Sequence, residues 1–144
     1  MTQRTVKQII EGQEPVIASA ATTVSEAARL MKSYNVGALM VVEGEKLVGV
    51  FTERDALFRV LAEGLNGDVT ALGAVMTRNP QTISSSANFT TALQMMHDGR
   101  YRHLPVVDDG RVIGVVSVRD ALGPELEAFV YEMLREAQIQ EVLA

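Results

Sequence analysis

The sequence contains no cysteine and no tryptophan among its 144 residues, and only 5% of them are aromatic. A chain without cysteine has no disulfides, no thiolate metal ligands and no cysteine nucleophile, which fits a reducing compartment such as the cytoplasm. No apolar run approaches the roughly 20 residues that span a membrane. The segment Met1–Ile10 has neither an apolar signal core nor a small-residue cleavage site. We therefore expect a cytoplasmic protein with no membrane partner.

Basic residues are in the minority, with 13 lysines and arginines against 18 aspartates and glutamates and a net charge of −5. Nonspecific binding of nucleic acid needs clustered lysine and arginine, so we expect no nucleic-acid partner. With 47% apolar residues, a chain of this length can bury enough surface for an independent core.

The sequence lacks the short motifs that identify several enzyme classes. It has no phosphate-binding GxxxxGK loop, no GxGxxG, no HExxH and no GxSxG. His97 and His103 are the only histidines, with no further histidine or cysteine to complete a metal site. The chain is therefore expected to be a non-enzyme without a metal centre.

The chain repeats itself at a constant offset of 65 residues, so that Pro15–Leu57 lies over Pro80–Leu122 without a gap. Of the 43 aligned positions, 13 are identical, among them Asp55 with Asp120. Average residue usage predicts only about 3 identities by chance. The sequence therefore indicates a duplication and two similar structural units.

Each copy predicts the same succession of an extended segment, a helix, an antiparallel hairpin and a second helix. In the first copy Thr23 and Glu26 form a capping box before the helix, and in the second copy Ser86 or Asn88 is the cap. The dipeptide Asp109-Gly110 is a strong hairpin signal. The expected extended segments are 16–19, 38–42 and 47–51 in the first copy and 82–84, 104–107 and 112–116 in the second.

A unit of about 60 residues is marginal alone. Its strands are nearly continuous apolar runs, so both faces of each sheet need cover, and the other copy is the natural cover. The sequence therefore predicts a mixed α/β (α+β) fold. Its expected parts are a first repeat over 1–71 with a lead-in helix at 6–12 and a connector, a second repeat over 72–122, and a tail over 123–144.

The tail follows Gly123-Pro124 and has no counterpart in the repeat. Its apolar residues fall on one helical stripe, and the opposite face is acidic. The stripe consists of Leu126, Phe129, Val130, Met133 and Ala137. Such a helix either packs on its own domain or meets a copy of itself. We favour self-association, and hence a homodimer.

The candidate chemistry lies at the strand-to-helix junctions Thr52–Asp55 and Ser117–Asp120, which share the pattern Ser/Thr-x-Arg-Asp. One interpretation is structural, because a hydroxyl residue followed three positions later by an acid is also a capping box. The other is a nucleotide site, in which the hydroxyl, the helix start and the arginine bind phosphate and the carboxylate accepts hydrogen bonds from a ribose.

The stretch Gly99–Val107 brings two arginines, a tyrosine and a histidine ahead of a strand whose second residue is Pro105. The structural interpretation is a solvated loop followed by an edge strand. However, residues 78–122 hold five arginines against four aspartates, whereas 13–57 hold four basic residues against six acidic ones. We therefore expect an anion to prefer the second copy.

The pattern Arg-His-Leu-Pro-Val-Val, a short turn, Val-Ile-Gly-Val-Val and Ser-x-Arg-Asp resembles the cystathionine-β-synthase (CBS) domain, and two such copies resemble the tandem pair known as a Bateman module. The connector Val75–Pro80 is similar to the start of a repeat in that family, and the resemblance covers about residues 6–122. It implies two pseudo-twofold-related βαββα units packed through their sheets, with two clefts between them. It also implies a flat homodimer and an adenosine ligand such as AMP, ADP, ATP, NAD(H) or S-adenosylmethionine.

The resemblance further implies a role for individual residues. In the second copy Ser117 and Arg119 would face phosphate and Asp120 the ribose, while the walls would be shaped by Thr82, Ile83, Arg102, His103 and Pro105. In the first copy Thr52, Arg54 and Asp55 match the motif, with Ile17 and Ala18 at the strand position. Gly37, Ala38 and Met40 stand where the second copy has Arg102, His103 and Pro105, so the first site is expected to lack the basic wall.

Two functions of different classes follow. The first is an adenine-nucleotide-binding regulatory module whose ligand shifts its conformation or controls a protein on another chain. The alternative is a ligand-free oligomerisation scaffold whose junction motifs only cap helices. An enzyme acting on nucleotides has little support, because no general base or metal cluster accompanies the motif.

Overall fold

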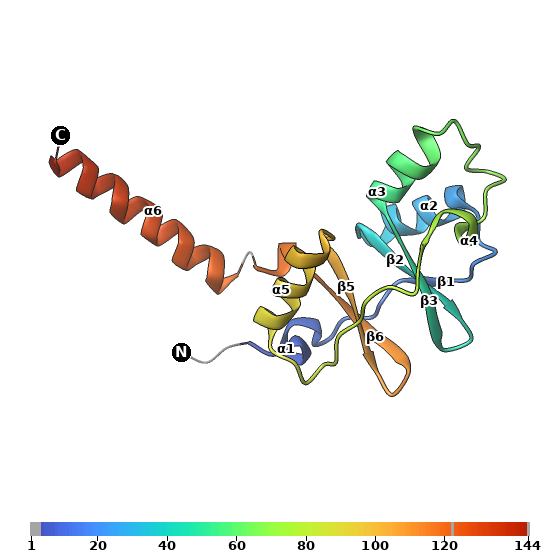
Figure 1. Cartoon of the computed structure of the whole chain (residues 1–144), viewed down its shortest axis with the longest axis horizontal. Coiled ribbons are helices and arrows are strands. Elements are labelled where there is room, and N and C mark those ends of the chain that lie inside the picture. The colour runs from blue at the N-terminus through green and yellow to red at the C-terminus, as the bar shows by residue number, and fades with distance from the viewer. Residues whose placement is uncertain (1–3, 122, 144) are drawn as a thin grey trace.

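The computed structural model describes residues 4–121 and 123–143. It contains two similar lobes side by side, each with strands and helices, and a long helix that leaves the second lobe (Figure 1). The strands join in one sheet of order β1-β2-β3-β6-β5, with β4 paired to β3. This mixed α/β architecture confirms the predicted fold class.

The first lobe contains the predicted helix and hairpin of the first copy. Its elements are β1 (Ile17–Ala18), α2 (Val24–Tyr34), β2 (Ala38–Glu43), β3 (Lys46–Thr52), α3 (Glu53–Asp55) and the π-helical η1 (Ala56–Leu61). Thr23 caps α2, since its side chain accepts a hydrogen bond from the backbone N–H of Glu26. The helix ends at Asn35, whose left-handed backbone directs the chain into β2.

The second lobe repeats this order at the predicted offset. Its elements are α5 (Phe89–Gly99), β5 (His103–Asp108), β6 (Arg111–Ser117) and the 3-10 turn η2 (Val118–Ala121). Asn88 is the N-cap residue of α5, although its side chain makes no capping hydrogen bond. The expected strand 82–84 is reduced to one parallel bridge between Ile83 and Val106. The expected second helix is interrupted after η2, because the chain continues through Gly123-Pro124 into the tail.

The two hairpins share details that support duplication. The ladder shifts between Val41 and Val42 in the first hairpin and between Val106 and Val107 in the second, which are equivalent positions. At the tip of the second hairpin Asp109 and Gly110 both have positive φ, 52° and 78°, as a type I′ turn requires. The positions of both hairpins were therefore predicted correctly from local features of the sequence.

The lobes meet about a pseudo-twofold axis. Lys46 of β3 pairs with Arg111 of β6, and these two residues are equivalent at the offset of 65. An element that pairs with its own equivalent lies on a twofold axis. A small apolar cluster of Ala38, Met40 and Val50, with Leu47, Val112 and Val115 packed against it, fills the junction. Each copy thus covers the other, as the apolar strands predicted.

The short segments that precede each repeat are exchanged between the lobes. Helix α1 (Val6–Ile10) packs in the second core, where Val6 and Ile10 join Phe89 and Met96. The backbone N–H of Val6 donates to Ala87 O at 2.8 Å. This differs from the expectation that 6–12 leads into the first copy. The spacing of the apolar residues predicts a buried segment at 6–12, but it does not indicate in which lobe that segment packs.

The reciprocal segment behaves in the same way. Helix α4 (Leu72–Val75) and strand β4 (Thr77–Arg78) precede the second repeat but complete the first. Leu72, Val75 and Met76 are buried in the first core, and Thr77 pairs with Val50 of β3. On the opposite side the amide of Gln13 imitates this pairing, accepting from Val115 N at 2.6 Å and donating to Val115 O at 3.1 Å.

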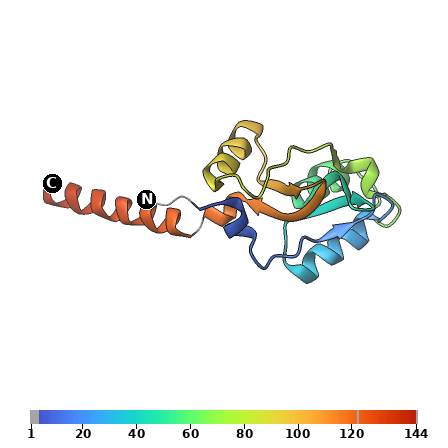
Figure 2. The same cartoon turned by 90° about the horizontal axis from the view of Figure 1, so that it is seen from below.

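The tail is the single helix α6 (Pro124–Leu143). It projects away from both lobes in two perpendicular views (Figures 1 and 2). Every side chain from Tyr131 to Gln140 is exposed, including Met133 and Ala137 of the predicted stripe. The other three residues of the predicted stripe, Leu126, Phe129 and Val130, have side chains that lie outside the described part of the structure. Of the two predicted alternatives, the described part of the helix does not pack on its own domain.

The exchange of α1 predicts that Ile10→Ala damages the second lobe more than the first. Removing a buried isoleucine costs about 2–4 kcal/mol of unfolding free energy. Denaturant unfolding measures the loss, and hydrogen exchange should accelerate in α5 and β6 more than in α2. Val69→Ala is the control, because Val69 is 78% exposed. Faster exchange confined to the first lobe would contradict the assignment of α1 to the second core.

Candidate functional site

Two cavities open between the lobes, and the pseudo-twofold relates them. We call them cavity 1, with a volume of 760 Å³, and cavity 2, with a volume of 350 Å³. Cavity 1 is lined by the first junction motif, by Pro80 and Gln81, and by Arg100–His103. Cavity 2 is lined by the equivalent residues at the offset of 65, namely the second motif, Pro15 and Val16, and Asn35–Ala38.

Each cavity is therefore assembled from both copies. The motif Thr52–Asp55 of the first copy faces the stretch Arg100–His103 of the second. Conversely, Ser117, Arg119 and Asp120 of the second copy face Asn35–Ala38 of the first. The expectation that the first motif lies in a site without a basic wall is wrong, because the second copy supplies that wall across the axis.

The charges of the two cavities differ in sign. Four arginines line cavity 1 against two carboxylates, those of Glu53 and Asp55. Two arginines line cavity 2 against three carboxylates, those of Glu14, Glu53 and Asp120. The count of charges by copy predicted that an anion prefers the second motif. The structure instead surrounds the first motif with the larger positive charge.

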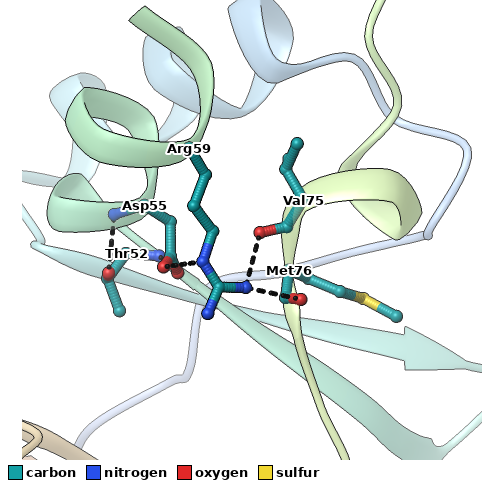
Figure 3. Close-up of polar contacts among 5 residues, drawn as sticks. All are labelled: Thr52, Asp55, Arg59, Val75 and Met76. Carbon is teal, nitrogen blue, oxygen red and sulfur yellow. Dashed lines mark hydrogen bonds and ion pairs between the residues drawn. The ribbon is translucent and has the colours of Figure 1, made fainter. Parts of the chain in front are cut away.

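Asp55 is a buried charged residue in the lining of cavity 1, and Figure 3 shows its polar contacts. Its side chain is buried, and its Oδ2 accepts a hydrogen bond from Thr52 N at 3.0 Å, while its own backbone N–H donates to Thr52 Oγ1 at 3.2 Å. These two bonds complete a capping box. The structural interpretation of the motif therefore holds here. A carboxylate offers about four acceptor positions, however, so Asp55 retains capacity for a ligand.

Arg59 connects this motif to the exchanged segment. Its Nε lies 3.4 Å from Asp55 Oδ1, and its Nη1 donates to the carbonyls of Val75 and Met76 at 3.3 and 3.2 Å. The guanidinium thus joins η1 to the end of α4 and holds the carboxylate in place (Figure 3). Because Arg59 also lines cavity 1, a bound anion meets an arginine that is already oriented.

The second motif is held less tightly. Asp120 Oδ2 accepts from Ser117 N at 2.7 Å and from Ser117 Oγ at 3.5 Å. These bonds correspond to one half of the capping box in the first copy. Asp120 is only partly buried, and the turn that follows it is a short 3-10 segment. The second carboxylate is consequently more available to a ligand and less important for the fold.

One side of cavity 1 is apolar and aromatic. Leu57 and Phe58 of η1 line it and remain about half exposed, at 50% and 55%. The Arg54 guanidinium lies over the Phe58 ring, 5.2 Å from its centre. Across the cavity the Tyr101 hydroxyl donates to the side-chain carbonyl of Gln81. An apolar surface beside arginines suits a flat, uncharged ring attached to an anion.

His103 lies at the boundary between the cavities and lines both. Burial lowers its pKa below the ordinary value of a histidine. The Glu53 carboxylate opposes this shift by raising the pKa, Arg102 lowers it further, and Asp120 raises it. The imidazole is therefore neutral near pH 7, and a nearby anion would favour its protonated form.

The structure brings ten of the predicted site residues to the cavities. Thr52, Arg54 and Asp55 line cavity 1, Gly37, Ala38, Ser117, Arg119 and Asp120 line cavity 2, and Arg102 and His103 line both. Six others, all in the described part of the chain, line neither cavity. Met40, Ile83 and Pro105 are buried, Ala18 is partly buried, and Ile17 and Thr82 are exposed.

Several lining residues escaped the sequence analysis. Glu53 lies inside the first motif, and Phe58 and Arg59 follow it. Arg59 stands four residues after Asp55, a spacing that brings side chains together on a helix and could have identified it. Pro80 and Gln81 line cavity 1 in place of Thr82 and Ile83. That shift of two residues had no signal in the sequence.

Among residues 4–121 and 123–143, no three histidine, aspartate or glutamate side chains are grouped closely enough to hold a metal ion. In the same part of the chain no helix combines the length and the apolar character that crossing a membrane requires.

Comparison with known proteins identifies the class to which this architecture belongs. The CBS domain family matches the chain twice, over residues 6–62 and 72–124, in agreement with the two lobes. The chain therefore belongs to the CBS domain family, with two tandem CBS domains.

Relatives support this assignment. The CBS domain-containing protein CBSCBSPB3 of Arabidopsis thaliana is 39% identical over 121 residues, which cover 83% of this chain and 22% of the relative. The chain thus spans about a fifth of the length of that plant protein.

Solved structures have the same fold. The CBS domain structure NE2398 is 31% identical with a TM-score of 0.80, covering 87% of this chain and 99% of its own. The CBS domain pair of protein MJ0100 is 30% identical with a TM-score of 0.72, covering 81% of this chain and 94% of its own. That pair was solved in complex with 5′-methylthioadenosine and S-adenosyl-L-methionine.

The difference between the two motifs predicts unequal effects of their carboxylates on stability. Asp55→Ala removes a buried cap and the partner of Arg59, and it should lower the free energy of unfolding by about 2 kcal/mol. Asp120→Ala removes half of a cap and should cost about 1 kcal/mol or less. Denaturant unfolding of the two variants compares them directly. Equal losses would show that the complete capping box gives Asp55 no special structural role.

Proposed function

We propose that this chain is a regulatory module that binds an adenosine ligand of the AMP, ADP, ATP, NAD(H) or S-adenosylmethionine class, with cavity 1 as the principal site for a phosphorylated ligand. The observation that carries the proposal is the combination in cavity 1 of a hydroxyl, a buried carboxylate, four arginines and an apolar wall. A bare anion would need only the arginines. An apolar ligand would need only the wall.

The parts of a nucleotide match the parts of cavity 1. A ribose diol donates hydrogen bonds, and Asp55 is fixed by Thr52 and Arg59 with acceptor positions to spare. Arginine forks bind phosphate oxygens well, and Arg54, Arg100 and Arg102 line the same cavity. The half-exposed Leu57 and Phe58 offer a surface for the base. The adenosine ligands of the MJ0100 pair support this class of ligand.

The proposed action is binding without catalysis. A ligand in cavity 1 touches the first motif and the Arg100–His103 stretch of the other copy, so it bridges the two lobes. It can shift the module between two arrangements to the extent that it binds one of them more tightly. We propose that this shift is sensed by a regulated protein, and that the module acts in the cytoplasm as a homodimer.

The alternative, a scaffold without a ligand, receives support from the complete capping box at Thr52 and Asp55. A cap alone does not account for the arginines around it. Arg54, Arg100 and Arg102 are exposed, and the bonds that close the box involve none of them. The charge at cavity 1 is therefore better explained by an anionic ligand than by helix capping.

Isothermal titration of the protein with AMP, ATP, NADH and S-adenosylmethionine tests the proposal. Arg54→Ala should weaken binding of AMP at least tenfold, whereas the twofold-equivalent Arg119→Ala should change the tighter binding step by less than about twofold. Both arginines are exposed, so both variants should fold. The absence of binding heat with all four compounds at about millimolar concentration would exclude the proposed function.

The low pKa of His103 predicts that the affinity for AMP depends on pH. In the free protein burial favours the neutral imidazole, and a phosphate beside it raises the pKa again. Protons are therefore taken up on binding, and the affinity should increase as the pH falls from about 8 to about 6. Titrations in buffers of different ionisation enthalpy measure the uptake, and His103→Gln should abolish it. An affinity that rises with pH would contradict this role.

The exposed tail predicts a dimer through α6. Tyr131, Met133, Leu134 and Ile139 are 68%, 54%, 62% and 49% exposed, which is a large apolar surface for one helix. Light scattering of the whole chain should give twice the monomer mass, and removal of residues 125–144 should give a monomer that still binds AMP. A dimer that survives the truncation would move the contact to another surface.

A further inference from the structure

The two cavities share part of their lining. Glu53, Arg102 and His103 line cavity 1 and cavity 2 alike, and we refer to these three residues as the shared wall. Two symmetric backbone bonds hold the shared wall in place. The N–H of Glu53 donates to Gly37 O at 3.0 Å, and the N–H of Val118 donates to Arg102 O at 3.0 Å.

The shared wall breaks the pseudo-twofold symmetry. The equivalents of Glu53, Arg102 and His103 at the offset of 65 are Val118, Gly37 and Ala38, none of which carries a charge. Therefore one set of charged side chains serves two cavities. In a symmetric pair each cavity would have its own set.

Gly37 allows these side chains to reach both cavities. A Cβ atom at Gly37 would lie 3.0 Å from Glu53 Oε1 and 3.3 Å from His103 Nε2. Gly37 lines cavity 2, so the Glu53 and His103 side chains closely approach that side of the boundary. The residue has no positive φ that would call for glycine, so close approach explains its small size better than backbone strain does.

We propose that the two cavities bind phosphorylated ligands antagonistically, with cavity 1 taking the phosphorylated adenosine ligand and cavity 2 then accepting an uncharged or cationic adenosine derivative. The proposal rests on the proposed function above. A phosphate in cavity 1 engages Arg102 and His103 and adds negative charge at the shared wall. Cavity 2 is left with Arg119 against the carboxylates of Glu14, Glu53 and Asp120.

This coupling must be reciprocal, because each ligand changes the affinity for the other by the same factor. Two phosphates bound on either side of the shared wall would repel each other, and the repulsion is strong because the protein excludes part of the water between them. It corresponds to a loss of about tenfold or more in the affinity for the second phosphate. An uncharged adenosine escapes this repulsion. It makes the ribose contact with Asp120 without competing for Arg102 and His103.

The test compares the affinity of cavity 2 for AMP when cavity 1 is occupied and when it is empty. In the intact chain, isothermal titration with AMP should show a tight first step and a weak second step. In the Arg54→Ala chain cavity 1 is weakened, and cavity 2 should then bind AMP at least about tenfold more tightly than the second step of the intact chain. Adenosine titrated into the intact chain with only the tight AMP step filled should bind with an affinity within about twofold of that in Arg54→Ala.

A second variant tests the shared wall itself. Arg102→Gln should weaken both AMP steps, whereas Arg119→Ala should weaken only the second. Arg29→Gln is the matched control, because Arg29 is an exposed arginine on α2 that lines neither cavity of the described structure. Thermal melting of each variant checks that it folds.

The outcomes separate the inference from the proposed function. If AMP binds cavity 2 with the same affinity in the intact and Arg54→Ala chains, the cavities are independent and the antagonism is wrong, while the proposed function stands. The antagonism also fails if Arg102→Gln weakens only one step. If the intact chain binds neither AMP nor adenosine, the proposed function fails, and this inference fails with it.

Discussion

The structure depends on the exchange of lead-in segments between two repeats that are each too small to close a core. Helix α1 packs in the core of the second lobe, and α4 with the following Met76 packs in that of the first. Burial of apolar surface drives this exchange, since an isolated unit of about 60 residues buries too little. The same exchange places η1 against the end of α4, where Arg59 fixes Asp55. The fold and the candidate site therefore rest on one arrangement.

The composite nature of the cavities follows from the twofold. The two repeats pack about an axis at which Lys46 meets its equivalent Arg111, and the cavity linings show that the motif of each repeat faces the strand start of the other. Duplication supplies two equal cavities, and later substitutions make them different. Arg100–His103 in one copy and Asn35–Ala38 in the other occupy equivalent places, yet the first stretch is basic and the second contains no charged residue. One scaffold thus presents two chemistries.

Much of the fold could be predicted from the sequence, because its signals are local. The capping residue Thr23, the turn at Asp109-Gly110 and the offset of 65 each specify a short piece of chain, and the structure contains all three features. The partner of α1 and the composition of cavity 1 could not be predicted. An internal repeat shows which residues are equivalent, but not which of them meet across an axis. Assigning charges copy by copy therefore missed that Arg102 and His103 line the cavities of both motifs and that Arg100 lines the cavity of the first.

The same principle limits what the sequence could indicate about single residues. Glu53 lies between two positions of the first motif, and the motif itself gives it no role. Its place in the shared wall depends on Gly37 and His103, which precede or begin two different strands. Asp55 was visible as a motif residue, but its burial and its contact with Arg59 required the packed structure. Where the surroundings of a residue come from distant segments of the chain, its role could not be predicted from sequence patterns.

The composite cavities also constrain how the gene can change. After most duplications one copy keeps the original role and the other is free to diverge or decay. Here each half contributes residues to the lining of both cavities, and a deletion of either half removes a helix from the remaining core. Loss of one repeat would therefore cost the other repeat part of its core and both cavities part of their lining, so the structure favours inheritance of the two halves as a pair.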